Sequence, residues 1–180
     1  MSLPYPRELV RTLEFLADLC NRRREGDLET AKSLRDLCTS VGFPGARGIQ
    51  RADAEATWAH VPTLEALWDA DRDTAAEMAN RIFVECEARP HLVRHEGFDW
   101  HLHGLPEGAP VADAIAVDAA MAFVDLVRSD DTVRTKRCGD SRCERMFLDQ
   151  SRNRSRRFCS TTCQSRTNVA AFRARAGALG

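Results

Sequence analysis

The sequence predicts a mainly α-helical body with one small β-hairpin, followed by a compact C-terminal module built on four cysteines. Three observations predict this architecture. Apolar residues recur at helical spacing through most of the first 130 residues, the pattern alternates only at 91–103, and the cysteines form two short-spaced pairs after residue 134. The 180-residue chain, 43% hydrophobic and 29% charged, is typical of a globular protein. We expect a helical domain over 1–130 and a second unit over 134–176.

Two helices are predicted first, by apolar stripes that end in recognisable stop signals. The stripe from Leu9 to Cys20 ends in a basic turn before Gly26, and the stripe from Leu28 to Val41 ends at Gly42 and Pro44. Each stripe occupies one face of its helix, and that face is expected to be buried in a core.

Prolines and capping residues divide the next part of the body. A third helix is expected over 53–60, where Pro62 interrupts it, and Thr63 caps a short continuation. Asp73 is the expected cap of the following helix, which continues until Pro90.

The last two elements of the body differ from these helices. Residues 91–103 alternate like two short strands around Glu96-Gly97, which predicts a hairpin. Pro110 then opens the most apolar helix of the chain, which reaches Val127. Because this helix is apolar nearly all round, we expect it at the centre of the bundle.

The four cysteines carry the strongest chemical signal. They are spaced Cys-x4-Cys, fifteen residues, Cys-x3-Cys, at Cys138, Cys143, Cys159 and Cys163. Four thiolates close a tetrahedral shell around Zn²⁺ and leave no position for water or substrate, which is typical of a structural site. Two disulfides, or chance spacing in a chain with seven cysteines, are the alternatives. We expect one structural zinc per chain.

The residues around these ligands predict a treble-clef-like zinc finger. A tight knuckle holds the first cysteine pair, residues 145–149 and 156–158 pair as a short hairpin, and Ser160 caps a final helix that reaches Ala176. The module has too few apolar residues to fold unaided. Zinc binding, worth about 10–16 kcal/mol in finger peptides, is expected to supply the missing folding energy.

The formal net charge of −1 conceals two oppositely charged parts. Residues 134–180 hold twelve Lys/Arg and three Asp/Glu, a net charge of +9, whereas residues 1–133 hold fourteen Lys/Arg and twenty-four Asp/Glu, a net charge of −10. Such asymmetry indicates a polyanionic partner for the basic end. Pairing of the basic end with the acidic body, within one chain or between subunits, is the alternative.

The basic residues divide by their expected position. Arginines in or beside the loop at 151–157 are expected to neutralise phosphates, and Arg166 and Arg173, seven residues apart, share a face of the final helix. Gln164 and Asn168 share another flank, with side chains suited to base edges. The candidate nucleic-acid contacts are Arg152, Arg154, Arg156, Arg157, Gln164, Arg166, Asn168 and Arg173. A solvated charged face is the alternative.

Four histidines cluster on the predicted hairpin: His91, His95, His101 and His103. A second metal or a catalytic base is one interpretation, and half-buried histidines without a metal are the other. The sequence has no glycine-rich phosphate loop, nucleophile elbow or metalloprotease motif. We therefore expect no enzymatic activity and name no catalytic residue.

The C-terminal segment resembles the CGNR zinc finger, a bacterial module. The matching residues are Phe147-Leu148-Asp149, the run from Ser151 to Arg157, Cys159-Ser160, Cys163 and the AlaAlaPheArgAlaArg ending at 170–175. The family's Cys-Gly-Asn-Arg is replaced here by Cys163-Gln164-Ser165-Arg166. The preceding body resembles the ABATE domain, a stress-induced transcription regulator domain, through TrpHisLeuHis at 100–103 and the alanine-rich helix after it.

The resemblance implies a zinc-binding, DNA-binding transcription regulator, with the four cysteines as ligands and the helical body as an effector or dimerisation domain. Because a lone finger contacts little DNA, we expect a homodimer formed through the body. A small-molecule sensor or protein-interaction module with a structural zinc tail and no nucleic-acid binding is the alternative.

The sequence also bears on location. No apolar run approaches the roughly 20 residues needed to cross a bilayer, and the N-terminus lacks the apolar stretch of a signal peptide. The remaining cysteines, Cys20, Cys38 and Cys86, sit singly in helical patterns, which suits a reducing compartment. We expect a cytoplasmic protein with no membrane contact.

Overall fold

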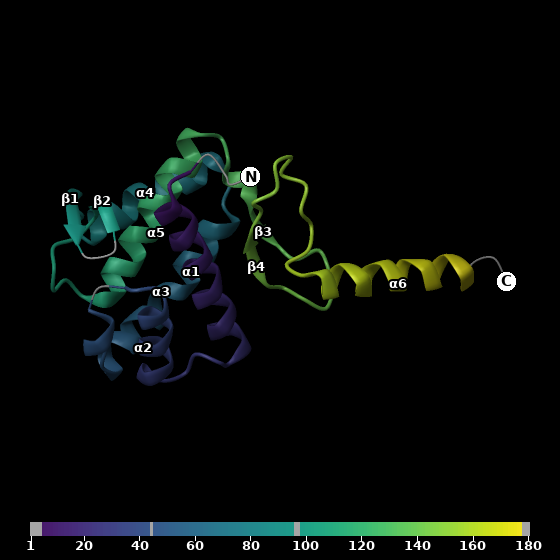
Figure 1. The fold of residues 1–180 in the computed structure, drawn as a ribbon, viewed down its shortest axis with the longest axis horizontal. Coiled ribbons are helices and arrows are strands. Elements are labelled where there is room, and N and C mark those ends of the chain that lie inside the picture. Colours follow the sequence, from purple (N-terminus) through teal and green to yellow (C-terminus); the bar gives the residue numbers. More distant parts are fainter. Residues whose placement is uncertain (1–4, 44, 96–97, 178–180) are drawn as a thin grey trace.

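The computed structural model describes residues 5–43, 45–95 and 98–177, and it shows a helical bundle with two short hairpins and a projecting C-terminal helix (Figure 1). In the body, the elements are α1 (Arg7–Glu25), α2 (Ala31–Ser40), a 3-10 turn η1 (Ala46–Gly48), α3 (Arg51–Asp69), α4 (Arg72–Glu85), β1 (His91–His95), β2 (Phe98–His103) and α5 (Val111–Arg128). The C-terminal part contains a 3-10 turn η2 (Thr132–Arg134), β3 (Thr135–Arg137), β4 (Met146–Leu148) and α6 (Thr161–Gly177). The mainly helical fold class is confirmed.

Helix α5 lies at the centre of the bundle, as its apolar sequence predicts. It packs against α1, α3 and α4 and buries residues on most of its circumference. The rings of Trp68 on α3 and Phe123 on α5 meet edge to face, with centroids 6.5 Å apart. No helix in the described part of the chain combines the length and apolarity needed to cross a membrane.

The predicted break at Pro62 is wrong, because α3 continues through it from Arg51 to Asp69. Proline removes one helical hydrogen bond and disfavours the preceding turn. Here its ring is exposed, while Val61, Leu64 and Leu67 beside it are buried. Burial of that face compensates the local cost, and Thr63 lies within the helix rather than capping a new one.

The N-cap of α4 also lies two residues earlier than predicted. Asp71, rather than Asp73, accepts a hydrogen bond of 2.8 Å from the backbone N–H of Thr74. Asp73 lies inside the first turn, where a carboxylate favours the positive end of the helix dipole. The predicted stop residue Pro44 and the predicted turn Glu96-Gly97 fall outside the described residues.

The first hairpin has an unusual distribution of side chains. Strands β1 and β2 pair antiparallel with His91 opposite His103, Leu92 opposite Leu102, and Val93 opposite His101. Directly opposed residues lie on one face of a ladder. The face with Leu92, Trp100 and Leu102 is open to solvent, with exposed fractions of 64%, 63% and 53%. The opposite face, which carries His101 and His103, is half-buried.

The second hairpin uses different strands from those predicted. Strand β4, inside the predicted segment 145–149, pairs with β3 at 135–137, so the prediction of a ladder with 156–158 is wrong. Residues 156–158 form no strand, because Asp149 Oδ2 accepts the N–H of Arg156 at 2.9 Å. The Arg156 N–H thus bonds to a side chain, and it is not available for backbone pairing with β4.

Strand β4 fastens the C-terminal part to the bundle. All three of its residues are buried, and Met146 and Leu148 belong to the same core as the helices. Asn21, a buried residue on α1, donates to the Met146 carbonyl at 2.9 Å and accepts from the Met146 N–H at 2.8 Å. One side chain therefore satisfies both backbone groups on the free edge of the strand.

The substitution Asn21→Ala is expected to lower the free energy of unfolding by about 2–4 kcal/mol, because it leaves two buried backbone groups without partners. Urea unfolding of the zinc-loaded protein measures this value. The exposed control Lys32→Ala should change stability by less than about 0.5 kcal/mol. Equal stability of the two variants would show that Asn21 does not fasten β4.

Candidate metal centre and basic surface

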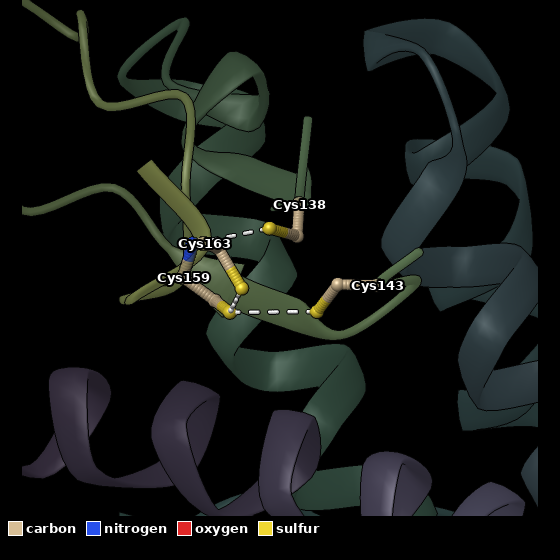
Figure 2. A group of neighbouring side chains, drawn as sticks. All are labelled: Cys138, Cys143, Cys159 and Cys163. Carbon is tan, nitrogen blue, oxygen red and sulfur yellow. Dashed lines mark hydrogen bonds between the residues drawn. The ribbon is translucent and has the colours of Figure 1, made fainter. Parts of the chain in front are cut away.

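The sulfur atoms of the four cysteines converge on one point (Figure 2). They all lie within 4.8 Å of one another, and the Cys143–Cys159 and Cys159–Cys163 pairs are each 3.7 Å apart. Four sulfurs placed about 2.3 Å from a tetrahedral Zn²⁺ stand about 3.8 Å from each other. None of the four cysteines forms a disulfide in this structure, in which bonded sulfurs would lie about 2.05 Å apart. The cluster is a zinc-binding site with room for one structural ion per chain.

The first two ligands lie on the knuckle between β3 and β4. The N–H of Cys138 donates to the Arg145 carbonyl at 2.9 Å, and the N–H of Cys143 donates to the Asp140 carbonyl at 2.8 Å. Gly139 allows the backbone of Arg157 to approach, because a Cβ there would lie 3.1 Å from the Arg157 carbonyl oxygen. The knuckle is thereby held against the chain that leads to the second cysteine pair.

The last two ligands are positioned by the start of α6. Ser160 Oγ accepts the N–H of Cys163 at 3.2 Å, which confirms the predicted capping residue. The N–H of Cys159 points at Cys138 Sγ over 3.5 Å, a contact that stabilises thiolate charge. Helix α6 therefore begins at the cysteine cluster and extends away from the body (Figure 1).

An ion pair between the half-buried Arg166 and the buried Asp140 supports the site from outside its ligands. Arg166 Nη2 donates to Cys163 Sγ at 3.1 Å, and Arg166 Nε donates to Asp140, which is 4% exposed. The same carboxylate accepts the N–H of Arg142 at 3.1 Å. Arg166 thus joins the knuckle to α6. The sequence indicates the contact between Arg166 and Cys163, because residues three apart in a helix are neighbours.

The thiols differ in how readily they ionise. The Ser160 hydrogen bond, aided by contacts that include Arg166, lowers the pKa of Cys163 to about 7 despite some burial. Burial, together with hydrogen bonds to the other cysteines, raises the pKa of Cys159 to about 12. Metal binding must displace protons from the thiols that retain them.

The arginine-rich loop at 151–157 rests on a buried carboxylate. Asp149 is fully buried and accepts from Lys136 Nζ at 2.6 Å and from the Ser151 N–H at 2.8 Å. Burial raises the pKa of Asp149, but these hydrogen bonds outweigh it and hold the pKa below its usual value. Arg134 Nη1 also donates to the carbonyl oxygens of Asp149 at 3.0 Å and Ser151 at 2.8 Å. The loop is organised before any partner binds.

The predicted phosphate contacts on this loop occupy different environments. Arg152 is exposed and makes no ion pair with a described residue, and Arg157 is exposed with its guanidinium 5.6 Å from the Phe158 ring. Arg156 lies 5.0 Å from the Phe147 ring and donates to the Phe158 carbonyl at 2.9 Å. Arg154 forms an ion pair of 2.7 Å with Asp131.

The predicted contacts on α6 separate into two sides. Gln164 and Asn168 are exposed near the start of the helix. Arg166 and Arg173 both line a shallow groove between the knuckle and α6, and Arg142 contributes a third guanidinium to it. The predicted shared face of Arg166 and Arg173 is present, although Arg166 is engaged with Asp140 and Cys163.

Part of the basic charge pairs with the acidic body, which was the alternative considered from sequence. Arg137 forms ion pairs with Asp69 at 2.8 Å and with Glu65 at 3.5 Å. Arg145 pairs with Glu25, on the last turn of α1. These arginines orient the finger on the bundle, whereas the loop and α6 keep arginines that face solvent.

The comparison with known families agrees with the metal site. Residues 134–176 match the family model described as the CGNR zinc finger. The matched segment begins inside η2 and ends one residue before α6 does. No curated protein matches the chain.

Zinc affinity is expected to fall as pH is lowered from 8 to 6, because Cys163 takes up a proton below a pKa of about 7 and protons compete with the metal. The substitution Arg166→Gln should weaken zinc binding about 10–100-fold at each pH, since it removes the Sγ hydrogen bond. Competition with a chromophoric chelator measures both effects. Wild-type affinity in the Arg166→Gln variant would contradict the supporting role of this residue.

Proposed function

We propose that this protein is a DNA-binding transcription regulator whose C-terminal zinc finger contacts the duplex. The observation that carries the proposal is the loop at 151–157, which is fixed from beneath by Asp149 and Lys136 while it presents exposed arginines. A rigid loop loses little conformational entropy when it contacts phosphates. Arginine forks also match phosphate oxygens in geometry.

The loop and α6 have different roles in this proposal. Arg152, Arg157 and, from the groove beside α6, Arg173 contact phosphates, which sets affinity without reading sequence. Gln164 and Asn168, exposed and one helical turn apart, contact base edges when α6 enters the major groove. Arg166 acts through the metal site, because its guanidinium is bound to Asp140 and Cys163.

Binding to a random-sequence duplex across a salt series tests this function. A slope of log affinity against log salt of about −2.7 per bound subunit is expected, since Arg152, Arg157 and Arg173 each neutralise one phosphate and each neutralised phosphate contributes about −0.9. The Arg152→Gln/Arg157→Gln variant should reduce the slope by about 2 units. The matched control Arg51→Gln/Arg128→Gln removes the same charge from exposed helical positions in the body and should leave the slope unchanged.

Two outcomes would overturn the proposal. A slope near zero, or equal slopes in both double variants, would favour the alternative, a protein-interaction or small-molecule-sensing module with a structural zinc. The ion pairs that Arg137 and Arg145 make with carboxylates of the body support this alternative, in which the finger binds an acidic protein surface. The resemblance of the body to the ABATE domain and the expected effector stay predictions.

The body is proposed to form a homodimer through the outer face of the first hairpin. Leu92, Trp100 and Leu102 form a contiguous apolar face there, with Arg94 stacked 5.4 Å from the Trp100 ring. An apolar patch open to water is typical of an interaction site. A two-fold axis would pack this face against its own copy and double the basic surface offered to DNA.

The substitution pair Leu92→Lys/Leu102→Lys is expected to convert the dimer to a monomer, because two charges on each subunit would be buried at the interface. Sedimentation equilibrium measures the mass of each form. Val133→Lys, a change at an exposed apolar residue of η2, should leave the dimer intact. A monomeric wild-type protein at micromolar concentration would refute the interface.

A further inference from the structure

Beyond its first two turns, helix α6 is exposed on all sides. It extends away from the body (Figure 1), and every residue from Asn168 to Arg175 is open to solvent. Most helical stability in proteins comes from packing of one face, so an isolated helix of this length is only marginally stable in water. A partner that covers α6 would therefore also stabilise it.

The charge and shape of α6 indicate the class of that partner. The helix carries Arg166, Arg173 and Arg175, and it has no aspartate or glutamate between Thr161 and Gly177. Positive charge without any carboxylate attracts a polyanion. The diameter of an α-helix, about 10–12 Å, also fits the major groove of B-DNA, which is about 12 Å wide. Duplex DNA is therefore the occupant that these properties favour.

Five exposed residues lie on one face of α6. They follow each other at intervals of four, three, one and three residues, which is the spacing of a single helical face. The residues are Gln164, Asn168, Ala171, Phe172 and Arg175. Since Gln164 and Arg175 are eleven residues apart, this face extends for about 16 Å along the helix axis. It can meet about four consecutive base pairs, which rise about 3.4 Å each.

The side chains on this face prefer different bases. Glutamine and asparagine form paired hydrogen bonds with adenine, arginine does so with guanine, and apolar side chains contact the methyl group of thymine. Phe172, which is 66% exposed, and the adjacent Ala171 are the apolar members of the face. The preferred base therefore changes along the helix in a fixed order.

We propose that Phe172 and Arg175 are specificity-determining residues, and that α6 reads adenine, thymine and guanine in that order along the helix. The inference rests on the proposed contact with DNA and adds the base that each turn reads. Gln164 and Asn168 contact adenine near the cysteine cluster, Phe172 contacts a thymine methyl group, and Arg175 contacts guanine near the C-terminal end. Val169 lines the groove toward the knuckle and does not face the bases.

Selection from a random-sequence duplex library with the full-length, zinc-loaded protein tests this order. Enriched duplexes should share adenine, thymine and guanine within about four or five base pairs. Arg175→Gln should lower the preference for guanine at its position about 10–100-fold and leave the other positions unchanged. The matched variant Arg152→Gln should weaken binding to every duplex equally, because Arg152 contacts phosphate.

Replacement of the selected thymine by uracil tests the contact of Phe172, because uracil lacks only the methyl group. This replacement should weaken binding of the wild type about fourfold, the contribution of one buried methyl group. Phe172→Ala should bind both duplexes equally. The control Val169→Ala, at a residue that is 48% exposed but lines the groove toward the knuckle, should keep the fourfold difference.

Three outcomes would overturn the inference. Binding without an enriched sequence would remove the base-reading role of α6 and leave the proposed contact with phosphates standing. An enriched sequence that is the same in Phe172→Ala and Arg175→Gln would show that other residues read the bases. Loss of all binding at low salt would overturn the proposed function and this inference together. Circular dichroism and zinc content of each variant confirm that its fold is intact.

Discussion

The attachment of β4 to α1 is the constraint on which the rest of the C-terminal part depends. Asn21 holds both backbone groups of Met146, and the side chains of Met146 and Leu148 extend the helical core. The zinc knuckle is the continuation of this strand and of β3, so its position is set by the bundle. Small zinc modules have little apolar core of their own, and here part of that core is provided by the neighbouring helices.

Two carboxylates connect the metal to the basic surface. Asp140 accepts a hydrogen bond from Arg166 beside the Cys163 sulfur, and Asp149 accepts one from Lys136 beneath the arginine-rich loop. Both are buried where an unpaired charge would be costly, so each fixes the cation that neutralises it. Part of the positive charge of the finger is therefore neutralised by ion pairs inside the finger, and only the remaining arginines face solvent.

The sequence was most informative where a single chemical requirement dominates. Four thiolates at short spacing predicted the metal site, and a helix that is apolar nearly all round predicted the centre of the bundle. The prediction of a helix break at Pro62 was wrong, because burial of the neighbouring face keeps α3 continuous. The prediction of the strand that pairs with β4 was also wrong, because the hydrogen bond from Arg156 to Asp149 replaces a ladder at 156–158. Asn21 looked like part of a polar helix end, because its partner is 125 residues away in the chain. The role of Arg166 depends on Asp140, whose position only the folded knuckle reveals.

The projection of α6 has a mechanical consequence. Its 17 residues extend for about 25 Å from a first turn that is fixed at the cysteine cluster (Figure 1). A rotation of about 10° at that turn moves the far end by about 4 Å, more than the rise between adjacent base pairs. Arg166 fixes the start of α6 through its hydrogen bonds to Cys163 and Asp140. A small change in the angle between the knuckle and α6 would therefore displace the C-terminal end of the helix by several ångströms.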